Sequence, residues 1–134
     1  MSITAIRAAL EVALKSITPA IATAWENIEF SPTEDVPFQR LGLGRAKPDD
    51  SEIGQLHIEQ GILIVSLNYP TGVGPCDAEA RADLVRSTFA KGRSFSASGV
   101  TVTIMGTPEV PQGQPVEGWF VVPVKIPWRA QVPN

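Results

Sequence analysis

The sequence is poor in the residues that carry most redox, metal and disulfide chemistry. Its 134 residues include one cysteine, Cys76, and one histidine, His57. A single cysteine excludes a disulfide within the chain, so we exclude a disulfide-stapled secreted fold and expect a reducing cytoplasm as the compartment. One histidine and one cysteine offer no zinc-ligand spacing, and we expect neither a metal nor a cofactor.

Long hydrophobic runs are also missing. No stretch of roughly 20 apolar residues, the length that a membrane-spanning helix needs, occurs in the sequence. Near the N-terminus, Arg7, Glu11 and Lys15 interrupt the apolar residues, so this segment lacks the continuous apolar core of a signal peptide. We therefore expect no membrane as a partner.

Charge is modest in amount and slightly negative in sign. Charged residues make up 19% of the chain, and the net charge is −3. Tight binding of nucleic-acid phosphates needs clustered Lys and Arg, so we expect no sequence-specific nucleic-acid partner. The apolar content of 43% is typical of a globular protein, and the length fits one domain over residues 1–134.

Two segments have the apolar spacing of amphipathic helices. Residues 2–18 place apolar side chains three and four positions apart, and Pro19 disfavours helical geometry at the residue before it. The second helix is predicted from Pro75, which suits a first turn, to Gly92, which suits a C-terminal stop. Each helix has one apolar stripe, which predicts that both pack against another element.

Four segments are predicted as strands. They are residues 38–43, 60–69, 100–105 and 118–130, of which 60–69 is the most β-branched and apolar. Residues 44–56 are dense in turn-forming and charged residues, which indicates a long exposed loop or a hairpin tip. The order of elements predicts an α+β fold, in which an antiparallel or mixed sheet of about four to five strands carries both helices on one face.

The last predicted strand has two different faces. Alternate residues from Phe120 to Trp128 are apolar and should face the core, while Trp119, Val121, Pro123 and Pro127 have the opposite parity. The two prolines lack N–H donors on the same side of the strand, which predicts an edge strand whose proline side faces outward. Trp119 beside Val121 is then an aromatic that a partner could cover, unless it packs under a neighbouring loop.

No segment has the residue pattern of a catalytic or nucleotide-binding site. LGLGRA (41–46) and TGVGP (71–75) lack the remaining residues of nucleotide-binding loops, so both are read as turns. The acidic run at 49–52 lacks the ligand spacing of a calcium loop and is read as a solvated loop. One alternative from a different class is a small-molecule-binding or thiol hydrolase domain, in which Cys76 at a helix N-terminus uses His57 as its base.

The layout of the segments resembles the tail terminator proteins of long-tailed phages and prophages, of the minor tail protein U type. The resemblance spans nearly the whole chain. It is carried by QGILIVSLNYPTGVG after the first helix, by DAEARADLVRSTFAKG with its F-x-x-G turn, by SGVTVTIMG, and by EGWFVVPVKIPWRA with its G-W start and I-P-W end. The fold expected of this family, an α+β subunit, agrees with the fold predicted from the residues.

The resemblance implies a structural role and no enzymatic one. Members of the family close into hexameric rings on the finished tail tube, where they end its polymerisation and offer a surface for joining the head. The implied partners are other copies of the chain, the tail tube protein and the head-completion or neck proteins. The implied location is the cytoplasm of the bacterial host during assembly, and then the virion tail. A neck or head-completion protein at the portal side is the alternative.

A ring uses heterologous contacts, in which one patch meets a different patch of the neighbouring subunit. As candidate patches we take the outer face of the last strand, with Trp119 and Val121, and the loop at 44–56, with Arg45 and Lys47. A disordered segment can fold when it binds, and the loop is expected to become ordered only on assembly.

Overall fold

The fold is α+β, as predicted, but its sheet has more strands than the four to five expected. The computed structural model describes residues 2–49 and 56–133, which form two helices and seven strands. The helices are α1 (Ser2–Lys15) and α2 (Cys76–Thr88). The strands are β1 (Ala22–Ala24), β2 (Phe38–Arg45), β3 (Leu56–Pro70), β4 (Ser94–Ala97), β5 (Val100–Ile104), β6 (Gln114–Val116) and β7 (Trp119–Pro133).

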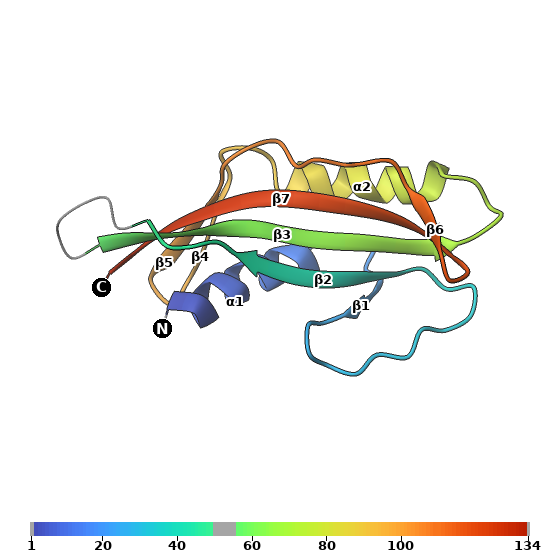
Figure 1. The fold of residues 1–134 in the computed structure, drawn as a ribbon, viewed down its shortest axis with the longest axis horizontal. Coiled ribbons are helices and arrows are strands. Elements are labelled where there is room, and N and C mark those ends of the chain that lie inside the picture. The colour runs from blue at the N-terminus through green and yellow to red at the C-terminus, as the bar shows by residue number, and fades with distance from the viewer. Residues whose placement is uncertain (1, 50–55, 134) are drawn as a thin grey trace.

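The strands form one mixed sheet in the order β1-β2-β3-β7-β5-β4, with β6 paired to β7. β1 runs parallel to β2, and every other pairing in the described chain is antiparallel. Figure 1 shows that β2, β3 and β7 form a long curved surface and that both chain termini lie at the same end of it. The two longest strands, β3 and β7, pair along their whole lengths and form the centre of the sheet.

Three short strands, β1, β4 and β6, lie outside the predicted segments. They are three or four residues long and contain small residues, serine or proline, which have little strand preference. Their neighbours stabilise them instead. In β4, the hydroxyls of Ser94 and Ser96 pair with Thr103 and Thr101 of β5 at 3.0 and 2.9 Å. These strands therefore depend on contacts that a local sequence pattern does not contain.

The hydrophobic core lies between one face of the sheet and the two helices. Leu63, Val65 and Leu67 alternate along β3 and are fully buried, as are Val124 and Ile126 opposite them on β7. The buried side chains of both helices belong to the same cluster, so both helices pack on one face of the sheet, as predicted; they are Ala5, Ile6, Ala9, Leu10, Ala13, Leu14, Ala78, Ala82 and Val85. Burying one large aliphatic side chain stabilises a fold by roughly 1.5–3 kcal/mol.

The prediction that the last strand lies at the sheet edge is wrong. One side of β7 pairs with β3, from Trp119 opposite Pro70 to Pro133 opposite Leu56. The other side pairs with β6 at its beginning and with β5 near its end. The predicted faces of the strand are confirmed, because Val122, Val124, Ile126 and Trp128 are buried and Phe120 packs against the core while partly exposed.

The prolines of β7 fit an inner strand because they border a break in its pairing. The backbone N–H and C=O of Lys125 both bond to Glu109, at 2.8 and 2.9 Å, so residues of this parity direct their backbone groups away from β3. Pro123 and Pro127 share this parity. Their missing N–H groups therefore fall between β6 and β5. There the described residues make the Glu109–Lys125 bridge and a hydrogen bond from the Met105 N–H to the Pro127 carbonyl oxygen, at 3.0 Å. Proline costs no ladder hydrogen bond in such a place.

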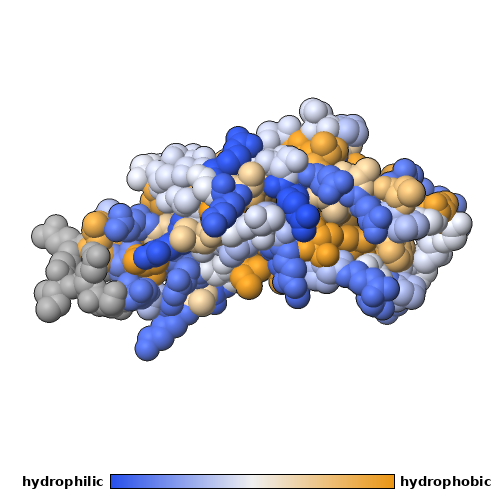
Figure 2. All heavy atoms as spheres, turned by 90° about the horizontal axis from the view of Figure 1, so that it is seen from above, coloured by the Kyte–Doolittle hydropathy of each residue, from blue (hydrophilic) through white to orange (hydrophobic). Residues whose placement is uncertain are grey.

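The face of the sheet opposite the core carries no helix of the described chain. Ile62 and Ile64 of β3 have this parity and are 45% and 37% exposed. Figure 2 views the molecule from above, at right angles to Figure 1, so that the sheet is seen from its side; hydrophilic residues cross the middle of this view between smaller apolar patches. We call the side of β3 and β7 that points away from the helices the open face, defined by Ile62, Ile64, Pro123, Lys125, Pro127 and Arg129.

Candidate functional site

Trp119 and Val121 lie at the start of β7 and have the parity of the open face, as predicted. Trp119 is only partly exposed, because its ring packs edge-on against Phe38 with centroids 4.9 Å apart. Phe38 packs in turn against Phe30, from the segment between β1 and β2, at 5.0 Å. Trp119 therefore packs beside a neighbouring segment, which was the alternative to a fully exposed partner site.

Arg45 and Lys47 lie at the other end of β2 and are both exposed. The predicted loop at 44–56 is shorter than expected, because β2 continues to Arg45 and its pairing with the chain around β3 continues beyond it. Ala46 N–H donates to Gln60 O at 2.8 Å, and Asp49 and Ile58 exchange backbone hydrogen bonds of 2.9 and 3.0 Å. The first part of this segment is thus the arm of a hairpin, whereas 50–55, with most of the acidic run, lies outside the described residues.

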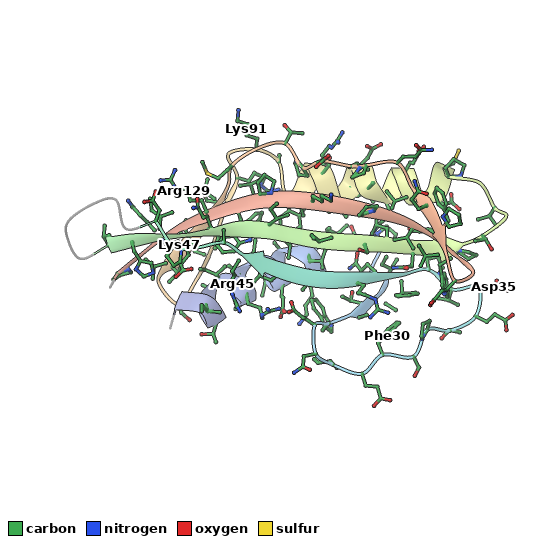
Figure 3. The ribbon with its side chains drawn as sticks, in the orientation of Figure 1. Phe30, Asp35, Arg45, Lys47, Lys91 and Arg129 are labelled. Atoms are coloured by element: carbon green, nitrogen blue, oxygen red, sulfur yellow. The ribbon has the colours of Figure 1, made fainter. Side chains whose placement is uncertain are left out.

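The structure does not bring the two predicted contact patches together. On β3, Pro70 is opposite Trp119 and Gly61 is opposite Arg45. About 30 Å of extended strand separates these two positions at the usual rise per residue. Figure 3 shows Arg45 and Lys47 toward the end of the sheet opposite to the one where Phe30 lies. The role of Trp119, Val121, Arg45 and Lys47 in assembly stays a prediction. The first two and the last two of these residues lie at opposite ends of one subunit.

His57 and Cys76 are also far apart. His57 lies near the start of β3 and Cys76 lies beyond its other end, so about 40 Å of strand separates them. His57 Nε2 is 2.9 Å from Glu59 Oε1, and Cys76 is exposed. A base must reach its nucleophile within hydrogen-bond distance, so His57 does not activate Cys76. In the described part of the chain, no three His, Cys, Asp or Glu side chains gather where they could hold a metal.

Glu26 makes an interaction that the sequence pattern did not reveal. β1 pairs with β2 only at residues 38–40, which leaves the rest of this β2 edge without a strand beside it among the described residues. Glu26 Oε1 accepts the backbone N–H of Leu43 at 2.9 Å and also accepts from Arg7 Nη2 at 3.2 Å. The Leu43 hydrogen bond lowers the pKa of Glu26 below its ordinary value of 4.5, against a smaller opposing effect of burial, and Arg7 lowers it further. The carboxylate thus satisfies a donor on an open edge.

Replacing Glu26 with glutamine should reduce the acid sensitivity of the fold. A carboxyl whose pKa is lower in the folded state stabilises the fold above its unfolded pKa, and this stabilisation is lost as pH falls through the folded pKa. The difference should be under about 1 kcal/mol, because the Glu26 side chain is 44% exposed. The measurement is the urea unfolding free energy at several pH values below 4.5, with Glu29→Gln as the matched control. Equal acid sensitivity of Glu26→Gln and the unaltered chain would contradict this assignment.

Arg81 of α2 is a charged side chain enclosed by the fold, only 3% exposed. Its Nη1 donates to the carbonyl oxygen of Pro19, in the segment that follows α1, while Nε and Nη2 have no hydrogen-bond partner among the described residues. Burial lowers the pKa of Arg81 and raises the pKa of Tyr69. Because the guanidinium is not accessible, we assign it the structural role of fixing the segment after α1 to α2.

The length and apolar content of the two helices decide whether either of them could cross a membrane. Neither α1 nor α2 is long and apolar enough to cross a bilayer.

Comparison with known proteins gives matches of two kinds. A family model described as phage tail terminator protein matches residues 5–128. One solved structure, whose title is only a sequence label, is 24% identical to this chain and superposes with a TM-score of 0.79, covering 98% of this chain and 97% of the other. At this identity the likeness shows the shared fold. Comparison with curated proteins gives no match.

The family match includes all of the elements that build the core. Residues 5–128 run from the first turn of α1 to Trp128, the large buried side chain of β7. A match of this extent is a match of the whole domain and not of one motif. It confirms the resemblance drawn from the sequence and supports a structural role in the phage tail. The chain belongs to the phage tail terminator family.

Proposed function

We propose that the chain caps the phage tail tube as a hexameric ring, which ends tube polymerisation and forms the surface that joins the head. The family match over residues 5–128 carries this proposal. The proposed partners are other copies of the chain, the tail tube protein and the head-completion or neck proteins. The proposed location is the cytoplasm of the bacterial host during assembly, followed by the virion tail.

The geometry of the subunit supports a ring. Its candidate contact residues lie at opposite ends of the sheet, Trp119 at one end and Arg45 at the other. Contacts between unlike surfaces join subunits head to tail, and they give a closed ring when the rotation between neighbours closes. The net charge of −3 suits a ring through which DNA passes, because a like-charged surface does not retain the phosphates.

The test of the proposal is where the chain binds. Tail tubes and portal–neck complexes of the same phage are incubated separately with the tagged chain, and a gold label on the tag is located by electron microscopy. We expect the label at one end of each tube, with ring-shaped density in end-on class averages. Label on the portal–neck complexes alone would indicate the neck protein instead. Label along the tube walls, or on neither particle, would contradict the proposal.

A further inference from the structure

We propose that the open face of the sheet binds the segment between β1 and β2 of a second copy of the chain. We call this segment, residues 25–37, the acidic loop. The inference rests on the proposed ring and specifies which two surfaces meet in it. It is carried by exposed apolar side chains and by opposite charges, which occur on both surfaces.

The apolar part of the open face centres on Ile62 and Ile64, which are 45% and 37% exposed. On β2 the residues opposite them are Gly44 and Gly42, so no β2 side chain lies beside either isoleucine. A methyl group placed on Gly42 would meet no atom within 4 Å, which shows that space is open there. Covering exposed aliphatic side chains removes apolar surface from water, so this area favours a partner with apolar residues of its own.

The charged part of the open face is basic. Lys125 and Arg129 stand on β7 beside the isoleucines. Nearby, at the start of β2, Arg40 has the same orientation, and its Cζ lies 5.7 Å from the centroid of the Phe38 ring. None of the three forms an ion pair with a residue in the described ranges. Glu109 adjoins Lys125 through the backbone bridge and offsets one of these charges. The face therefore favours an acidic partner.

The acidic loop has the complementary composition. Between Lys15 and Arg40 the sequence contains no Lys or Arg. Glu29, Glu34 and Asp35 are exposed and form no ion pair within the described chain. The loop also exposes two aliphatic side chains, Ile28 at 64% and Val36 at 45%. Three unpaired acids and two aliphatic residues of the loop thus complement the two isoleucines and two basic residues of the open face and the nearby Arg40.

Within one subunit the acidic loop meets this side of the sheet near the start of β2. Ile62 and Ile64 remain exposed. The acidic loop is held at its own end of the sheet by the packing of Phe30 on Phe38. Figure 3 shows Asp35 and Phe30 at one end of the molecule and Arg129 toward the other. A second copy can bring its acidic loop to this face, and its own open face is then free for a third copy. Such a contact is heterologous and produces a ring or a filament.

Charge reversal provides the test, because it can be applied to each surface separately. The face variant is Lys125→Glu with Arg129→Glu, and the loop variant is Glu34→Lys with Asp35→Lys. The control variant, Glu79→Lys with Asp83→Lys, reverses two exposed acids on α2. The readout is oligomer mass after chemical crosslinking, for the free chain over a concentration series and for the chain bound to tail tubes, with circular dichroism to check folding.

We expect self-association of the face variant and of the loop variant to weaken at least about tenfold, and that of the control variant to be unchanged. An equal mixture of the face and loop variants should assemble again, because in alternating order each acidic surface meets a basic one. Raising the salt concentration should weaken the unaltered assembly through screening. Recovery of assembly in the mixture is the decisive result, since a variant with a damaged fold would not assemble in the mixture either.

Each of four outcomes would overturn the inference. In the first, both variants assemble as well as the unaltered chain. In the second, the mixture assembles no better than either variant alone. In the third, the unaltered chain forms no oligomer, either free or on tubes. A face variant that keeps its oligomer mass but leaves the tubes would show that the face binds tube protein, which also overturns it. Failure of the proposed function is distinct, because the unaltered chain would then self-associate without binding a tube end.

Discussion

Replacing Gly61 with alanine is expected to destabilise the fold by about 3 kcal/mol or more, because β2 leaves no room for a side chain at this position. A Cβ atom on Gly61 would lie 2.0 Å from the carbonyl oxygen of Gly44 and 2.9 Å from Cζ2 of Trp128. The closer atom belongs to the backbone, so no change of side-chain rotamer relieves the contact. The β2–β3 pair must separate locally, at the point where Trp128 packs in the core. The measurement is the free energy of unfolding from urea denaturation.

The matched control is Gly42→Ala, in the neighbouring strand of the same sheet. A Cβ atom on Gly42 would meet no atom within 4 Å, and alanine suits a strand interior better than glycine. We expect this variant to change stability by less than about 1 kcal/mol, in either direction. Equal stabilities of Gly61→Ala and Gly42→Ala would show that the close β2–β3 approach at Gly61 is not a constraint on the fold.

The features that the sequence predicted correctly are local ones. The apolar stripe of α1 and the alternation from Val122 to Trp128 follow from side-chain periodicity, which a short segment contains in full. The fold class and the placement of both helices on one face followed from the order of these segments. Boundaries were less accurate, since β3 begins at Leu56 and not at Gln60, and α1 ends at Lys15 and not at Thr18.

The features that the sequence did not predict depend on partners far away along the chain. The prolines of β7 correctly indicated a side with missing donors, but the pairing of β5 and β6 around that side is not visible in the strand itself. The same holds for Trp119, whose exposure is reduced by Phe38, a residue of another strand. Strand order and side-chain burial of this kind are properties of the assembled sheet.

The candidate contact residues show the same division. The parity of Trp119 and Val121, and the exposure of Arg45 and Lys47, could be predicted from residue type and strand alternation. The acidic loop as a surface was not predicted, although the absence of Lys and Arg between positions 15 and 40 was a signal in the sequence. Recognising it required the position of the loop relative to the basic open face.

Adding the chain to growing tail tubes is expected to shorten them strongly, because one ring of the proposed kind at a growing end would be enough to stop further addition. The effect should therefore appear at a ratio of about one ring per tube, far below the amount of tube protein. The loss of self-association in the Lys125→Glu and Arg129→Glu variant should remove most of this effect, whereas the Glu79→Lys and Asp83→Lys variant should retain it. If the shortening depends on ring formation, it results from capping of tube ends. It does not then result from the chain binding free tube protein and removing it from growth.

The length distribution of tubes, measured by electron microscopy with and without the chain, tests the central claim most directly. The account predicts that the mean tube length falls as the chain is added during growth and that tubes already capped do not resume growth when fresh tube protein is supplied. An unchanged length distribution at one ring per tube, with continued growth from both ends, would contradict it.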